Sequence, residues 1–396
     1  MENYCSILEV DDEDDDNVCE ASPPTKDVAC VGAGIGGGFT HTSELKTLNY
    51  PEAMTSEEKT EWEEEIKLED DRMNKYNVWE PTPMYKEPEN TKPLTSTWVF
   101  KKKSNGKRRG RLNAHGFKQI EGVNFDKDDI AAPVTNEVTM RVLMVIILVL
   151  QLYSGLIDVK GAFLQGEFGK GEKELYIEAP QGLEKHYPKN VYLKLLAPIC
   201  GLRNAAMAFW RKLVTVMKKL NCDRSRADPC LHYKWTTDII ILWLSWIDDC
   251  IYAGKEDQVN KMKQEFMVEL DSEDSGALNE CVGVKVERKD DELKLTQPVL
   301  VQSLEDEFGV PKNVPKHLPA PPGKELLSDG ERLIPAEEKI YRSGVGKLLF
   351  IMRYSRPDVL NVVRELSKWM TCGSTVDHMK ILHQTINYIV HTKIGD

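Results

Sequence analysis

The sequence predicts an α+β fold in which helices and strands alternate along a chain of 396 residues. Short runs rich in β-branched and aromatic residues, bounded by turn residues, predict antiparallel hairpins. Between these runs, apolar residues recur every three or four positions, which is typical of helices that bury one face. The length allows a sizeable core and two or three subdomains.

The N-terminal third predicts a helix, a basic hairpin and a second helix. Residues 53–76 are charged with interspersed apolar side chains, as on a surface helix. Residues 96–103 and 107–114 flank an Asn-Gly turn, and their Lys and Arg residues suit a hairpin that binds phosphate. A helix is expected to begin near Thr135 or Asn136. Its apolar run is too short to cross a membrane, so we expect it to pack in the core.

The central third predicts strands around an amphipathic helix. Residues 156–160 alternate in polarity, so that Asp158 projects from the end of a short strand whose other face is buried. Residues 174–177 are strand-like, and residues 205–220 carry an apolar stripe at helical spacing. A lone aspartate in such a strand is more often an edge or turn residue, so a role for Asp158 depends on a partner.

The partner is a pair of carboxylates, Asp248 and Asp249, inside the apolar run 239–254. Within a continuous strand at least one of them would face the core, where an unpaired charge is costly. A strand–turn–strand hairpin with both at its tip removes that cost and presents oxygen ligands to a divalent cation such as Mg²⁺. A solvated turn is the alternative. Asp158 favours the metal site, because carboxylates on neighbouring strands can hold the two ions used in nucleotidyl transfer.

The C-terminal third predicts a helix, a hairpin, a linker and a helical region. The helix is expected near 258–270, and the hairpin at 281–288 and 292–295. Residues 311–335 are rich in proline and are expected to be a linker. Residues 341–370 are apolar with helical spacing.

Charge is distributed unevenly along the chain. The net charge is −12, but residues 1–72 hold 21 Asp or Glu and 5 Lys or Arg, which leaves a net +4 for residues 73–396. The acidic leader is typical of a solvated tail, and the basic remainder suits a nucleic-acid partner. Nine cysteines without a Cys-x-x-Cys motif and no signal segment predict an intracellular protein, either cytoplasmic or nuclear.

Two apparent cofactor motifs lack the context that they require. Residues 32–38 have the Gly-x-Gly-x-x-Gly spacing of dinucleotide-binding oxidoreductases, but no apolar helix follows, so a glycine linker is favoured. His378, His383 and His391 lack the spacing of zinc ligands, so surface or core histidines are favoured.

Three blocks resemble motifs of the reverse transcriptases of copia-type long-terminal-repeat retrotransposons. Residues 158–166 resemble the family's DVKxAFLxG block, residues 200–210 its YGLKQAxxxFW block, and residues 246–249 its YVDD box. Collinear matches extend the resemblance over roughly residues 50–396. They lie at 98–101, 109–117, 132–135, 178–182, 228–231, 341–348 and 355–358.

The resemblance implies a right-hand polymerase fold. An acidic and then Gly-rich disordered leader would occupy 1–48 and a helical lead-in 49–90. Fingers and a palm, the latter an antiparallel sheet flanked by helices, would occupy 91–290. A partial thumb or connection segment would occupy 291–396. The chain would then be a polyprotein fragment that ends before an RNase H domain.

The resemblance also implies an RNA-directed DNA polymerase that extends a primer on an RNA or DNA template with deoxynucleoside triphosphates. Asp158, Asp248 and Asp249 would be catalytic and would hold two Mg²⁺ ions, with Mn²⁺ as an alternative, and the carbonyl of Val159 would add a ligand. Phe163 would stack under the sugar and exclude a 2′-hydroxyl, unless it is an ordinary core residue. The residues expected to bind nucleotide are Lys102, Arg109, Arg111, Phe163, Arg203 and Asn204, and those expected to position the primer are Val282, Gly283 and Val284.

Several positions depart from the family's usual residues, namely Trp246, Cys200, Gly110 and His115. These departures are compatible with folding and bear on activity. The main alternative is therefore a catalytically inactive, truncated retrotransposon relic with at most nucleic-acid binding. The sequence predicts no oligomeric state.

Overall fold

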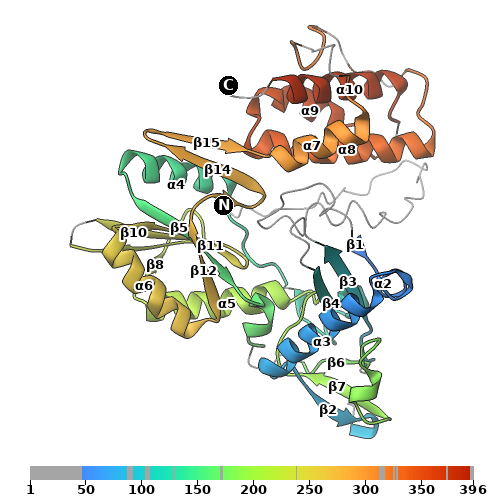
Figure 1. Cartoon of the computed structure of the whole chain (residues 1–396), viewed down its shortest axis with the longest axis vertical. Helices are drawn as coiled ribbons and strands as arrows, with labels where there is room; N and C mark the ends of the chain where they lie inside the picture. Colours follow the sequence, from blue (N-terminus) through green and yellow to red (C-terminus); the bar gives the residue numbers. More distant parts are fainter. Residues whose placement is uncertain are drawn as a thin grey trace.

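The computed structural model shows a mixed α+β protein, as predicted (Figure 1). The structure describes residues 47–86, 92–102, 108–127, 130–169, 173–237, 239–311, 317–323, 326, 329–371 and 373–392. Three predicted features lie outside these residues. They are residues 1–46 of the leader, the glycine segment 32–38 within it, and the turn at 104–106. No helix in the described ranges has the length and apolar character needed to span a membrane.

The largest sheet has six antiparallel strands in the order β12-β5-β11-β10-β9-β8. They are β5 (Tyr153–Val159), β8 (Asp223–Arg224), β9 (Leu231–Trp235), β10 (Ile240–Trp246), β11 (Asp249–Gly254) and β12 (Ser272–Ala277). Because side chains alternate along each strand, Ile157, Trp243 and Tyr252 share one face. Helices α5 (Ala205–Lys219) and α6 (Glu256–Glu269) cover that face (Figure 1).

The opposite face packs against α4 (Glu137–Val149) and a three-stranded sheet. That sheet consists of β13 (Glu280–Cys281), β14 (Val284–Lys289) and β15 (Glu292–Thr296). The predicted start near Thr135 or Asn136 is confirmed. Asn136 caps α4, since its side chain accepts a hydrogen bond from the N–H of Val138 at 2.9 Å. The prediction of a core helix is correct for one side of α4 only. The valines on the other side are at least half exposed, namely Val138, Val142, Val145 and Val149.

A separate core lies in the N-terminal part, where two three-stranded sheets pack with two helices. One sheet has the order β1-β3-β4 and consists of β1 (Thr47–Leu48), β3 (Ser96–Lys102) and β4 (Arg108–Ala114). The other has the order β2-β7-β6 and consists of β2 (Trp79–Pro83), β7 (Val191–Leu195) and β6 (Tyr176–Ile177). The helices are α2 (Tyr50–Thr55) and α3 (Lys59–Lys75). The prediction of one helix at 53–76 is wrong, because the N–H and hydroxyl of Ser56 both bond back to the carbonyl of Ala53 and end α2.

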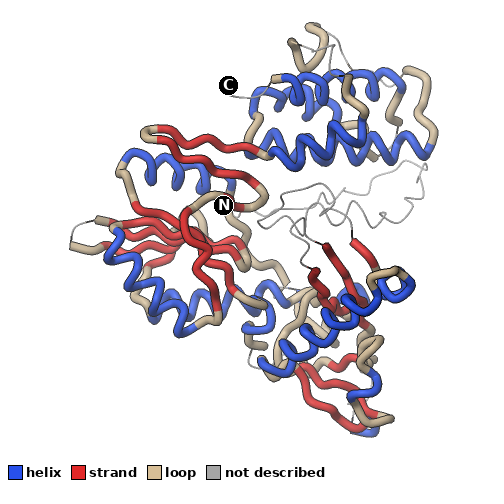
Figure 2. Tube along the Cα trace, viewed as in Figure 1, coloured by secondary structure: helices blue, strands red, loops and turns tan. Residues whose placement is uncertain are grey.

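The C-terminal part is helical, whereas strands and helices alternate in the rest of the molecule (Figure 2). Its helices are α7 (Pro298–Phe308), α8 (Pro335–Tyr354), α9 (Leu360–Ser367) and α10 (Val376–His391). The region predicted as helical at 341–370 is broken between α8 and α9. Pro357 explains the break, because proline lacks an N–H and restricts the residue before it. The described parts of the predicted linker contain no helix before α8 begins.

Candidate active site

The central strands bring the three predicted aspartates to one edge of the six-stranded sheet. Asp249 and Asp158 are direct partners across the antiparallel strands β11 and β5. The carbonyl of Asp248 accepts a hydrogen bond from the N–H of Val159 at 2.8 Å. Residues far apart in the sequence therefore meet because the hairpin β10–β11 pairs with β5.

The hairpin places its two aspartates differently from the prediction. Ile247 and Asp248 form the two-residue turn, whereas Asp249 is the first residue of β11 and is only 7% exposed. Asp249 is therefore not at a solvated tip. Ile247 has a φ of 54°, which is unusual for a β-branched residue and which glycine normally provides in such turns.

Burial and neighbouring negative charge raise the pKa of two of the aspartates, Asp249 and Asp158. Burial raises the pKa of Asp249 to about 7, and the charges of Asp248 and Asp158 add to the effect. Burial also raises the pKa of the half-buried Asp158, followed by the charge of Asp248, while Arg109 and Arg111 oppose the rise. Such mutual repulsion in a partly buried site favours binding of a cation.

The donor set suits a hard divalent cation. No three His, Cys, Asp or Glu side chains within the described ranges lie close enough to hold one ion as they stand. Asp158 and Asp249 nevertheless face each other from adjacent strands, and Asp248 lies beside them in the turn. Carboxylate oxygens are the ligands that Mg²⁺ prefers, so the chemistry of these residues fits the ion.

Strand β4 supplies positive charge beside the carboxylates. Arg109 and Arg111 are two positions apart and so share one face of β4. Burial and then the charges of Arg111 and Arg72 lower the pKa of Arg109, which also interacts with Glu69 and Asp158. The two predicted arginines are therefore brought to the aspartate edge, and the buried Glu69 balances part of their charge.

Lys102 is not brought to this group. It lies opposite Arg108 in the hairpin, on the face of the sheet that points away from Arg109 and Arg111. Both Lys102 and Arg108 form ion pairs with Glu58. In the structure Lys102 therefore has a partner at the start of α3, and its contact with nucleotide stays a prediction.

Phe163 lies one short loop beyond Asp158, on the 3₁₀ turn η5 (Ala162–Gln165). It is half-buried and packs against both the N-terminal core and the core under α5 and α6. Gly161 begins the turn with a φ of 58°. Phe163 thus has the packing expected of a core residue and a position next to the aspartates.

Arg203 and Asn204 lie just before α5. Arg203 donates from Nε to the carbonyl of Gly116 at 3.0 Å, and its guanidinium lies 5.2 Å from the ring centroid of Phe125. Asn204 is buried at 3% exposure. Arg203 therefore connects the start of α5 to the loop after β4, and Asn204 is buried beside it in the chain.

The residues predicted to position a primer form the tight turn between β13 and β14. Val282 and Gly283 have φ values of 52° and 69°. Val282 and Val284 are buried, so contact with a ligand there would involve the backbone and Gly283. The turn is close to the aspartates, since the charge of Asp249 contributes to the raised pKa of Cys281.

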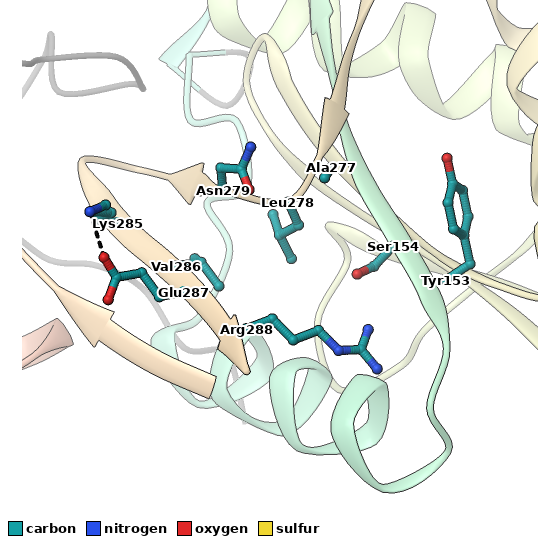
Figure 3. Close-up of a pocket in the computed structure, with 9 residues that line it drawn as sticks. All are labelled: Tyr153, Ser154, Ala277, Leu278, Asn279, Lys285, Val286, Glu287 and Arg288. Atoms are coloured by element: carbon teal, nitrogen blue, oxygen red, sulfur yellow. Dashed lines mark ion pairs between the residues drawn. The ribbon is translucent and has the colours of Figure 1, made fainter. Parts of the chain in front are cut away.

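A cavity of about 550 Å³ lies at the other end of β5 (Figure 3). Tyr153 and Ser154 of β5 line it together with Asn279 and Arg288. Five residues of strand, about 17 Å, separate Tyr153 from Asp158. The cavity is therefore distinct from the aspartate edge.

Sequence reasoning missed two residues that hold the site together. Glu69 is buried beside the arginines, and Gln165 bonds to the backbone of Lys160 and Asp271. Glu69 lies on a helix with many acidic residues, and Gln165 occupies one of the two variable positions of the block at 158–166. Neither residue therefore carried a signal in the sequence.

Comparison with known proteins gives a consistent result. A family model described as reverse transcriptase (RNA-dependent DNA polymerase) matches residues 76–322. The Retrovirus-related Pol polyprotein from transposon TNT 1-94 of Nicotiana tabacum is 30% identical over 298 residues, which cover 72% of this chain and 22% of that protein. The Pol polyprotein from transposon RE1 of Arabidopsis thaliana is 25% identical over 307 residues, which cover 74% of this chain and 20% of that protein.

A shorter relative aligns over most of its own length. A putative transposon Ty5-1 protein of Saccharomyces cerevisiae is 23% identical over 242 residues, which cover 60% of this chain and 76% of that protein. By contrast, the chain spans about a fifth of the length of the two plant polyproteins.

Proposed function

Because the chain belongs to the reverse transcriptase (RNA-dependent DNA polymerase) family, in the branch of copia-type retrotransposon Pol polyproteins, we propose that it is an RNA-directed DNA polymerase. It would extend a primer on an RNA or DNA template with deoxynucleoside triphosphates. The observation that carries this proposal is the pairing of Asp158 with Asp249 next to Asp248, with two arginines alongside.

The architecture supports a division into polymerase subdomains. The six-stranded sheet with α4, α5 and α6 would be the palm, because it carries the aspartates. The N-terminal sheets with α3 would be the fingers, because β4 carries the arginines. The sheet β13-β14-β15 and the C-terminal helices would be the primer-positioning and thumb or connection segments.

The proposed chemistry is two-metal nucleotidyl transfer. When bound to Asp158, Asp248 and Asp249, two Mg²⁺ ions would activate the primer 3′-hydroxyl and neutralise the charge that develops on the leaving group. Arg109 and Arg111 would bind the triphosphate, because their planar donors match phosphate oxygens.

Other residues would orient the substrates. Phe163 would pack under the sugar and exclude a ribose 2′-hydroxyl. The turn at Gly283 would hold the primer end through its backbone. Arg203 and Asn204 would support the template side through the loop after β4.

A catalytically inactive, nucleic-acid-binding relic is the second candidate. One observation favours it: Lys102, expected to bind nucleotide, is paired with Glu58. Both candidates predict binding of a primer–template, but only the polymerase predicts synthesis.

Primer extension on an RNA template with Mg²⁺ tests the proposal. We expect extension by the wild-type chain and none by Asp158→Asn, because that change removes a charge that the cation needs. Asp257→Asn, at an exposed position in the first turn of α6, is the matched control and should extend normally. A folded wild-type chain that binds primer–template without extending it would establish the relic.

A further inference from the structure

The loop between Asp158 and Phe163 is closed by one side chain, that of Gln165. Its Nε2 donates to the carbonyl of Lys160 at 2.8 Å and to the carbonyl of Asp271 at 2.9 Å. Its Oε1 accepts from the N–H of Asp271 at 2.9 Å. A single amide therefore joins the residue after β5 to the residue before β12.

Both ends of this link are themselves anchored. The N–H of Lys160 donates to the carbonyl of Asp271 at 3.0 Å, and Tyr76 donates to the carboxylate of Asp271 at 2.8 Å. Lys75 forms an ion pair with the same carboxylate. Since Tyr76 caps α3, the end of this helix fixes Asp271, to which Gln165 bonds.

The turn that carries Phe163 is joined to the start of β12 by this link, in addition to the packing of Phe163 against two cores. Within the turn, the N–H of Leu164 donates to the carbonyl of Gly161 at 2.8 Å, and that of Gly166 to the carbonyl of Phe163 at 3.0 Å. These bonds set the shape of the turn but do not connect it to β12. In the described structure, Gln165 makes that connection.

Glutamine has the chemistry that this position requires. Its NH₂ group supplies two donors for the two carbonyls, and its oxygen accepts from the N–H. Glutamate has the same length but lacks the donors, and asparagine has both groups on a shorter side chain. The three bonds therefore predict a graded response to substitution.

We infer that Gln165 is a positioning residue that sets the distance between Phe163 and Asp158 and thereby selects deoxyribonucleotides over ribonucleotides. The inference rests on the proposed function, because it assigns a specificity role within that site. Gln165 acts through the backbone of Lys160 and Asp271 and makes no contact with substrate.

The test compares the kcat/KM of single-nucleotide incorporation for a deoxynucleotide and the matching ribonucleotide. Gln165→Ala should reduce the discrimination by about tenfold, the effect of losing one or two net hydrogen bonds, mainly through a lower KM for the ribonucleotide. Gln165→Glu should behave similarly, and Gln165→Asn should restore part of the discrimination. Gln302→Ala, which removes an exposed bond to Asp306 on α7, is the control and should change nothing.

A double-variant cycle shows whether Gln165 acts through Phe163. In a Phe163→Ala background, Gln165→Ala should have no further effect on discrimination. Additive effects of the two substitutions would overturn the inference, and so would unchanged discrimination in Gln165→Ala and Gln165→Glu. In either case, primer extension by the wild type would still support the polymerase proposal. Absence of extension by the folded wild type would overturn both.

Discussion

Buried charged side chains of the C-terminal helices have partners of opposite charge, whereas the buried Asp249 of the central sheet has none in the described ranges. In the helical part, Lys347 is buried but bonds to Ser303 and Glu307, and Arg356 is buried but forms a two-pronged ion pair with Asp358. In the sheet, Asp249 is as deeply buried and has no ion pair within the described ranges. Charge that is compensated serves stability, whereas charge that is left uncompensated is typical of a functional site.

The first way to test this contrast is to remove charge from the sheet. Asp248→Asn should lower nucleotide incorporation by at least about a thousandfold, because a neutral amide cannot replace the carboxylate at the cation. The melting temperature should stay within a few degrees of the wild type, since Asp248 lies in a turn. Single-turnover extension and thermal melting measure the two effects, with Asp257→Asn as control. Incorporation at the wild-type rate would contradict the assignment of Asp248.

The second test removes charge from the helical part. Arg356 donates to Asp358 and to the carbonyls of Ile389 and Thr392 at the end of α10. Arg356→Ala should lower the free energy of unfolding by about 3–5 kcal/mol, because it leaves these acceptors without their donor. Urea unfolding measures the loss.

The exposed Arg364→Ala, in α9, is the matched control and should cost less than about 1 kcal/mol. Equal losses in the two variants would show that the buried cap of α10 contributes no more than a surface ion pair.

The third test uses the buried histidine of each region. In the helical part, Nδ1 of His378 accepts a hydrogen bond from the N–H of Thr375 at 3.0 Å. In the sheet, neither ring nitrogen of His232 has a well-formed hydrogen bond, and burial followed by the charge of Arg224 lowers the pKa of His232 to about 4. Between pH 6.5 and pH 4 the unfolded chain binds a proton that the folded chain does not, so stability falls as pH falls through this window.

His232→Phe should remove about 3 kcal/mol of this acid sensitivity between pH 7 and pH 4. Urea unfolding of the variant and the wild type at several pH values measures the difference. The exposed His317→Phe is the control and should leave the pH dependence unchanged. Parallel curves for wild type and His232→Phe would show that His232 is not a source of acid instability.

The smallest expected effect is a gain in stability. Asp249→Asn should raise the free energy of unfolding at pH 8 in the presence of a chelator by about 1–2 kcal/mol, because it removes a buried carboxylate that its neighbours repel. Urea unfolding measures the gain, and Asp257→Asn should show none. Destabilisation by Asp249→Asn would mean that the carboxylate is compensated after all.

Local patterns predicted most of the elements. The α+β class, the start of α4 near Asn136 and the strands of the central hairpin follow from local sequence patterns. The break at Ser56 and the break before Pro357 were missed because helical spacing continues across them. The prediction placed Asp249 at the tip of the hairpin because a run of residues does not show which two form the turn.

Most contacts between distant segments could not be predicted from the sequence. Gln165 and Asp271 are 106 residues apart, and the pairing of Lys102 with Glu58 joins two segments that are separated by 44 residues. The sequence did predict that Asp158 lies close to Asp248 and Asp249. Carboxylates in apolar strands are costly unless they share a ligand such as a cation. The family motif at 355–358 is different, since Arg356 and Asp358 serve the packing of α10.

The turn at Ile247 has a consequence for evolution in the laboratory. Glycine or asparagine would adopt its left-handed backbone more readily than a β-branched side chain. Selection for heat tolerance alone should therefore replace Ile247 quickly. If selection also requires DNA synthesis, retention of Ile247 would show that its side chain contributes to synthesis, and its loss would show that it does not.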